Sequence, residues 1–132
     1  MSGKASGTEN RAQIERVPEP LKPRVAGLIR LARRAGTVVI GIELTRQAVR
    51  AGRARAIWVA DDLSDRRATV LLTRWRSSGV ATYGGWTKDE LGDLAGKPAV
   101  AVLSVTDRNI ADGVSQILTA AMSGETERGE QG

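Results

Sequence analysis

The chain contains no cysteine and no histidine among its 132 residues. Without cysteine it has neither disulfides nor thiolate chemistry, and zinc sites of the Cys/His kind are excluded as well. Without histidine it lacks the side chain that most often performs acid–base catalysis near neutral pH. Any enzymatic activity would have to use carboxylates, lysines, hydroxyls or the single tyrosine, Tyr83. We therefore expect a non-enzymatic protein with no catalytic residues, no metal site and no cofactor.

Long hydrophobic runs are also missing. The longest, Thr37–Gly41 and Ala99–Leu103, have the length of strands, whereas about 20 apolar residues are needed to cross a bilayer. The first residues, Met1–Gly7, lack the apolar stretch of a secretory signal. These observations predict a cytoplasmic protein without a membrane partner.

Positive charge is plentiful, and it is concentrated in the middle of the chain. The formal net charge is +5, but residues 21–106 alone carry 15 basic and 7 acidic side chains, while six glutamates lie near the two ends. Of the 20 basic residues 16 are arginine, whose planar fork of donors matches phosphate and the guanine edge. A polyanionic partner and a merely solvated arginine-rich surface explain this charge about equally well.

Polar ends enclose one stretch in which helical and strand patterns alternate. Residues 1–21 are predicted to be a flexible arm, residues 22–122 a folded domain, and residues 123–132 a disordered tail. The alternation predicts an α/β fold, a three-layer α/β/α sandwich with a four-stranded, mostly mixed sheet. The expected helices cover residues 24–35, 42–51, 64–76, 87–96 and 107–122, and the expected strands cover residues 37–40, 56–60, 80–83 and 99–105.

Two segments suggest ligand sites but are better explained by local structure. The segment Gly92–Lys97 has three residues between its glycines where a phosphate-binding P-loop has four, and Pro98 follows its lysine. Gly96 is better interpreted as the C-cap of a helix. The segment Asp61–Asp65 holds three carboxylates after a strand, as a magnesium site could. Turn formation and negative charge at a helix N-terminus explain it more economically.

The three tryptophans are predicted to be mainly structural. Trp58 and Trp75 fall on apolar stripes and are expected in the core. Trp86 follows Tyr83-Gly84-Gly85 in a loop, where it could stack a nucleic-acid base or anchor the loop. The pattern favours the anchoring role.

The helix that starts after Gly41 carries the most informative polar face. Backbone N–H groups at a helix N-terminus, directly after a glycine, favour phosphate. At 100° per residue, one side of this helix holds Leu44, Thr45, Ala48, Val49 and Ala51, and the other holds Glu43, Arg46, Gln47 and Arg50, with Arg53 and Arg55 continuing the basic track. The alternative is a solvated face on which Glu43 pairs with Arg46 and Gln47. Without further information this alternative is slightly favoured.

The order of several segments changes that balance, because it resembles a known family. The segments that carry this similarity are, in order, Gly27–Gly36, Val38–Gly41, Ala48–Arg55 and a strand that ends Ala60-Asp61-Asp62. The sequence is similar to the ribosomal protein family of L7Ae and L30e, specifically its bacterial members. Thr87–Gly92 with Gly96-Lys97, and Val102–Asp107, fit the last helix, loop and strand of that family. The resemblance covers about residues 22–120.

The resemblance implies an α/β/α sandwich that binds structured RNA, often the kink-turn. Family members insert the N-terminus of the second helix into RNA near sheared G·A pairs, and a loop before the last strand holds a flipped-out base. In many members that helix begins Gly-x-Asn-Glu-x-x-Lys. The matching positions here are Gly41, Glu43, Leu44 and Gln47, so only the glycine is kept. Backbone contacts are therefore expected to carry more of the binding than base readout.

We therefore predict non-enzymatic binding of structured RNA, such as ribosomal RNA, by a protein associated with ribosomes or RNA processing. The alternative is a protein-interaction module in a translation or transcription assembly, with arginines facing acidic partners. The expected RNA contacts are Arg33, Arg34, Gly41, Ile42, Glu43, Arg46, Gln47, Arg50, Arg53, Lys97, Pro98 and Ala99.

Overall fold

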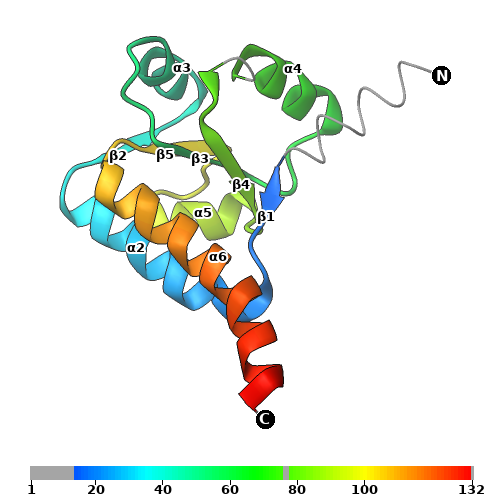
Figure 1. The fold of residues 1–132 in the computed structure, drawn as a ribbon. Coiled ribbons are helices and arrows are strands. Elements are labelled where there is room, and N and C mark those ends of the chain that lie inside the picture. The colour runs from blue at the N-terminus through cyan, green and yellow to red at the C-terminus, as the bar shows by residue number, and fades with distance from the viewer. Residues whose placement is uncertain (1–13, 76–77, 132) are drawn as a thin grey trace.

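A computed structural model of the protein describes residues 14–75 and 78–131. Helices cover both faces of a mixed β-sheet, so the predicted three-layer α/β/α sandwich is confirmed (Figure 1). In chain order the elements are β1 (Glu15–Arg16), the 3-10 helix η1 (Glu19–Leu21), α2 (Lys22–Arg34), β2 (Val38–Ile40), α3 (Ile42–Arg50), β3 (Ala56–Val59), α4 (Asp65–Trp75), β4 (Ala81–Gly84), α5 (Lys88–Ala95), β5 (Val102–Val105) and α6 (Arg108–Gln131).

The sheet has five strands, not the four expected, in the order β1-β4-β3-β5-β2. Strands β1, β4 and β3 are parallel, and β5 is antiparallel to both β3 and β2. The additional strand, β1, lies within the segment predicted to be a flexible arm. Ile14 and Val17 on either side of it are buried, and the Val17 amide donates to the Gly84 carbonyl at 2.9 Å. Residues 14–21 therefore belong to the folded domain, while residues 1–13 lie outside the described part.

Each face of the sheet has its own hydrophobic core, because successive side chains of a strand point to opposite faces. Ala56, Trp58 and Ala60 pack in one cluster with the buried residues of α2, α5 and α6. Ile57 and Val59 pack in the other cluster with α4 and, at its margin, α3. Helices α3 and α4 therefore share the face opposite α2, α5 and α6, as Figure 1 also shows.

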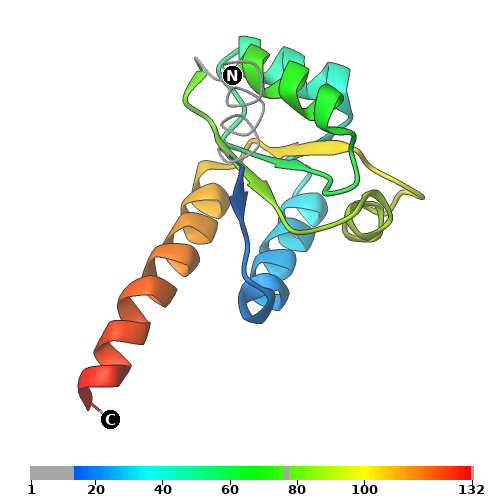
Figure 2. The same cartoon turned by 90° about the vertical axis from the view of Figure 1, so that its right-hand side faces the viewer.

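The last helix is longer than the sequence predicted. The sequence predicted a disordered tail from residue 123, whereas α6 continues to Gln131 in the structure and extends away from the sheet (Figure 2). A helix that is already nucleated adds one hydrogen bond for each residue that it fixes. Its continuation therefore does not need the hydrophobic contacts whose absence suggested a tail.

Tyr83 packs against Trp58 in the core, with ring centroids 5.2 Å apart, and is 3% exposed. Burial raises its pKa above the ordinary value of 10.0, and the neighbouring Glu15 carboxylate adds to the effect. Because the folded state holds this proton more tightly, the stability from neutral Tyr83 is complete below pH 10 and is lost as the pH rises through the folded pKa.

We expect the tyrosinate absorbance of the folded protein to rise with a midpoint above that of the urea-unfolded chain. Tyr83 is the only tyrosine, so this signal reports a single group. Replacing Glu15 with glutamine should reduce the difference without removing it. Equal midpoints in folded and unfolded protein would contradict the burial.

Candidate nucleic-acid interface

Helix α3 begins at a glycine whose backbone faces open space. Gly41 has φ 105° and ψ 160°, and a Cβ added to it would meet nothing within 4 Å. Its amide donates to the Val102 carbonyl at 2.8 Å, and its carbonyl accepts from the Thr45 amide at 3.0 Å. The N–H groups of the first helical turn have no partners within the helix. Another molecule can therefore approach this backbone closely and accept hydrogen bonds from it.

The loop that precedes β5 lies at the same edge of the sheet. Gly41 is hydrogen-bonded to Val102, the first residue of β5, and Lys97, Pro98 and Ala99 lie a few residues before it and are exposed. The loop is held by two hydrogen bonds to α5, from the Lys97 amide to the Gly92 carbonyl at 2.8 Å and from the Val100 amide to the Lys88 carbonyl at 3.0 Å. The start of α3 is thus hydrogen-bonded to the strand that directly follows this loop.

Arg33 also reaches this edge, although it belongs to α2 on the other face of the sheet. Its guanidinium lies directly over Gly96, the C-cap of α5 and the start of the loop. A cation is favourable there because the C-terminal end of a helix carries partial negative charge. Arg33 therefore adds positive charge beside Lys97.

Much of the polar face of α3 is engaged in local pairs. One nitrogen of Arg46 donates to both carboxylate oxygens of Glu43 at 2.6 and 2.8 Å, and the Gln47 amide donates to the same carboxylate at 3.4 Å. The hydrogen bond from Arg46 is the main cause that holds the pKa of Glu43 below its ordinary value, and the one from Gln47 adds to it. The pairing offered by the sequence as the alternative does occur. Arg46 would have to share its guanidinium with Glu43 to contact a phosphate.

Leu44 was expected on the inward side of α3, and this expectation is wrong. Its side chain is 53% exposed, whereas Thr45 and Ala48 are fully buried. The helix presents a narrow stripe to the sheet, and Leu44 lies beside that stripe. In the pattern of the family this position holds glutamate, so an apolar side chain replaces a polar one at the edge of the proposed interface.

The remaining predicted contacts lie toward the opposite edge of the sheet. Arg53 belongs to the turn between α3 and β3, whose backbone hydrogen-bonds to Val105 at the end of β5. Arg34 ends α2, and the turn after it hydrogen-bonds to the residue that follows Val105. That edge is roughly 10 Å from Gly41 along β5, and Arg50 ends α3 roughly 12 Å from its first residue. The twelve residues predicted as one site are therefore spread along α3 and β5, with Arg34, Arg50 and Arg53 toward the end away from Gly41.

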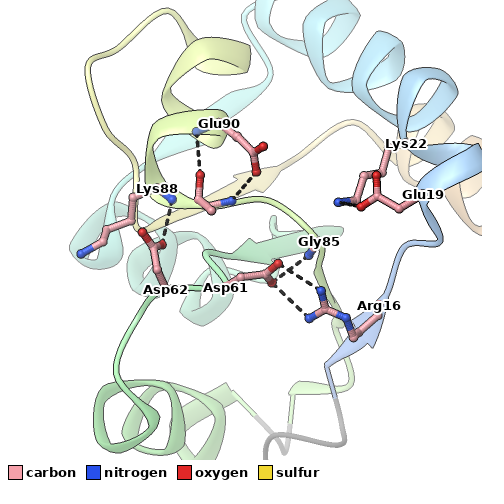
Figure 3. A network of polar contacts seen from close by, with 9 residues as sticks. Arg16, Glu19, Lys22, Asp61, Asp62, Gly85, Lys88 and Glu90 are labelled. Atoms are coloured by element: carbon pink, nitrogen blue, oxygen red, sulfur yellow. Dashed lines mark hydrogen bonds and ion pairs between the residues drawn. The ribbon is translucent and has the colours of Figure 1, made fainter.

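The acidic segment after β3 has a structural role. Asp61 accepts hydrogen bonds from the Gly85 amide at 2.9 Å and from the two terminal nitrogens of Arg16 at 3.1 and 3.3 Å (Figure 3). Asp62 accepts from the Lys88 amide at 2.9 Å, at the start of α5. The two carboxylates therefore join β1, the end of β3 and the loop before α5. Within the described residues, no group of three or more acidic side chains could hold a metal ion.

Trp86 anchors its loop and does not present a surface for stacking. It is 7% exposed, its carbonyl accepts from the Asp61 amide at 2.8 Å, and the Lys22 ammonium lies 5.6 Å from its ring centroid. Trp58 and Trp75 are buried as predicted. In the part of the chain that the structure describes, no helix has the length and apolar character needed to span a membrane.

Sequence reasoning missed three residues of α4 that face α3. Arg66, Arg67 and Val70 line a cavity of about 500 Å³ together with Ile42 and Arg46. A signal for them was present, because two arginines in the first turn of a helix oppose its dipole. Their position opposite α3 depends on how the two helices sit on the sheet, which no local pattern reports.

Comparison with known proteins agrees with this architecture. A search of curated proteins finds no match. Among solved structures, a protein of unknown function from Bacillus halodurans is 22% identical, with a TM-score of 0.67, covering 72% of this chain and 96% of that one. The Giardia lamblia 15.5kD RNA binding protein is 17% identical, with a TM-score of 0.66, covering 81% of this chain and 92% of that one. At these identities the likeness is one of fold.

The resemblance noted from the sequence is confirmed by a family model that matches residues 24–116. That range runs from α2 into α6 and includes both the start of α3 and the loop before β5. The chain belongs to the ribosomal protein L7Ae/L30e/S12e/Gadd45 family.

Proposed function

We propose that the protein binds structured RNA without catalysing a reaction, through the edge formed by the start of α3 and the loop before β5. The observation that carries this proposal is the open backbone at Gly41, which is hydrogen-bonded to Val102 of the strand that follows the exposed loop at Lys97. The family, and a relative in fold whose name states RNA binding, support it.

The residues divide into three roles in this proposal. The amides at the start of α3, after Gly41, donate to phosphate oxygens, and Lys97 and Arg33 supply positive charge. Gln47, Glu43 and the neighbouring Ile42 contact sugar or base edges. Pro98 and Ala99 give the second wall. Arg34, Arg50 and Arg53, toward the opposite edge, contact phosphates only of an RNA long enough to reach them.

The departures from the family pattern limit what base readout can contribute. Leu44 cannot hydrogen-bond a base edge, and Glu43 is paired with Arg46. We propose recognition of a kinked RNA backbone, as in a kink-turn, in ribosomal RNA or in an RNA that is being processed. The expected protein partners of this complex are ribosomal or RNA-processing proteins in the cytoplasm.

Titration of a fluorescent kink-turn RNA at several salt concentrations tests the proposal. Each phosphate contact should add about 0.9 unit to the slope of log affinity against log salt. Replacing Lys97 with alanine should lower that slope by about one unit while leaving the stability of the protein unchanged. Replacing Arg24, an exposed residue near the start of α2, is the matched control and should leave the slope unchanged.

Two results would overturn the proposal. One is an absence of binding at low salt to the kink-turn, a straight duplex and a single strand alike. The other is a Lys97 variant that binds RNA with the same slope and affinity as the parent protein.

A further inference from the structure

Helices α3 and α4 enclose a groove on the face of the sheet opposite α2 and α6. A cavity of about 500 Å³ adjoins a second of about 270 Å³, and Arg46 and Trp75 line both. We call the two together the α3–α4 groove. It follows α3 from Ile42 to Arg50, roughly 12 Å. It lies on the flank of α3 that faces α4 and begins at Ile42, the residue after Gly41. It therefore shares Ile42, Glu43 and Arg46 with the residues predicted to contact RNA.

The apolar lining of the groove comes from both helices. Ile42 of α3 and Leu71 and Trp75 of α4 contribute to it, and all three belong to or pack against the second hydrophobic core. Val70 is 48% exposed at its margin. A polar ligand would leave this apolar surface in contact with water. The lining therefore favours a ligand with aliphatic side chains.

Arginines surround the apolar lining. Arg66 and Arg67 are exposed in the first turn of α4, and Arg46 faces them from α3. Positive charge in the first turn of a helix opposes the helix dipole, so the dipole does not account for the position of these two arginines. Among the described residues that line it, the one acidic side chain is Glu43, which already binds Arg46. The groove is therefore complementary to negative charge.

Two buried donors point to an incomplete set of contacts. Trp75 is 3% exposed, and its indole Nε1 has no hydrogen-bond partner among the described residues. The Nε of Arg46 is likewise buried without a partner in that part of the chain. Buried donors without acceptors cost free energy. Both atoms are closed to solvent, so a ligand in the groove could satisfy them only after the side chains shift.

The groove fits a protein segment better than RNA. Single-stranded bases bind by stacking on the faces of aromatic rings, and the aromatic residue of this groove, Trp75, is buried. A channel between two helices with apolar walls and charged rims is the shape that receives an amphipathic helix. We propose that the α3–α4 groove binds an acidic amphipathic helix of a partner protein, with leucine-like side chains on Ile42, Val70 and Leu71 and carboxylates on Arg46, Arg66 and Arg67.

A set of synthetic peptides tests this assignment. The probe is a peptide of about 12 residues with leucines at i, i+3, i+4 and i+7 and glutamates between them. One control peptide has lysine for every glutamate, and another has serine for every leucine. The readout is the indole N–H signal of Trp75 in a nitrogen–proton NMR spectrum, with the signals of Trp58 and Trp86 as internal references.

The acidic amphipathic peptide should shift the Trp75 signal and leave the two reference signals in place. Both control peptides should bind about tenfold more weakly or worse. The double substitution Arg66→Glu and Arg67→Glu should weaken the acidic peptide by about tenfold, more at low salt than at high salt. The matched control is Arg24→Glu with Arg108→Glu, which makes the same charge change near the first turns of α2 and α6. It should have no effect on peptide binding.

Three outcomes would overturn the proposal. The Trp75 signal could stay in place at saturating peptide, or the Arg66 and Arg67 variant could bind the acidic peptide as the parent does. A kink-turn RNA that shifts the Trp75 signal in the parent but not in this variant would assign the groove to RNA instead. RNA affinity is measured separately with the Lys97 variant, so a failure of the peptide proposal can be told apart from a failure of the RNA proposal.

Discussion

Replacing Gly92 with alanine is expected to destabilise the protein by about 2–3 kcal/mol, because the new methyl group has no room. An added Cβ would lie 2.5 Å from the Lys97 carbonyl oxygen and 2.9 Å from both the Ala99 amide nitrogen and the Pro98 carbonyl carbon. These are backbone atoms, so they cannot move out of the contact by a bond rotation as the end of a flexible side chain can. The loop must move away from α5, and its hydrogen bond from the Lys97 amide to the Gly92 carbonyl is strained or lost.

Urea denaturation of the Gly92→Ala protein measures this loss. The control is Gly27→Ala in α2, where an added Cβ meets nothing within 4 Å. At such a helical position alanine should stabilise by about 0.5–1 kcal/mol, so the two variants should differ in sign. The Gly92 variant should also bind RNA more weakly, since its loop is displaced. Unchanged stability would mean that the loop does not rest on α5 as described.

Replacing Gly41 with valine is expected to lower both stability and RNA affinity. The backbone at Gly41, with φ 105° and ψ 160°, is one that side-chain-bearing residues rarely adopt, and forcing one into it costs about 1–3 kcal/mol. The valine side chain would also stand in the open space through which RNA is proposed to approach. We expect RNA affinity to fall by at least about tenfold, the loss of one charge-assisted contact.

Gly79→Val separates these two effects. Gly79 has φ 74° and open space around it, but it lies in the turn between α4 and β4. Valine there should cost stability for the same conformational reason and leave RNA affinity unchanged. If both variants kept the affinity of the parent for RNA, the start of α3 would not be the RNA contact.

The sequence predicted best the local features that depend on residues close together in the chain. Gly96 ends α5 as predicted, and Thr87 and Glu90, three residues apart at the start of that helix, form a capping box with hydrogen bonds of 2.8 and 3.2 Å. The pairs of Glu43 with Arg46 and Gln47 were also available from spacing along one helix. In each case both partners lie within four residues of one another, so no knowledge of the fold was needed.

Features that depend on distant partners could not be predicted in the same way. A strand of two residues, such as β1, has too few positions to show any periodicity, and its partner Gly84 lies 68 residues away. The exposure of Leu44 depends on the rotation of α3 against the sheet. The separation of Arg53 from Gly41, and the groove that Arg66 and Arg67 line, follow from how strands and helices are ordered in space. Composition predicts the sign of the charge there but not its grouping.

The central position of β5 has a consequence for synthesis of the protein. Strands β2 and β3 both take β5 as a partner, yet β5 is the last strand of the chain. During synthesis, Val38–Ile40 cannot pair with β5 until residue 105 has been added. The pairing joins residues that are 63 to 67 positions apart in the chain. Such distant pairings slow folding and leave apolar strands uncovered in the meantime. A chain that ends before Val105 should therefore engage chaperones more than the full chain does.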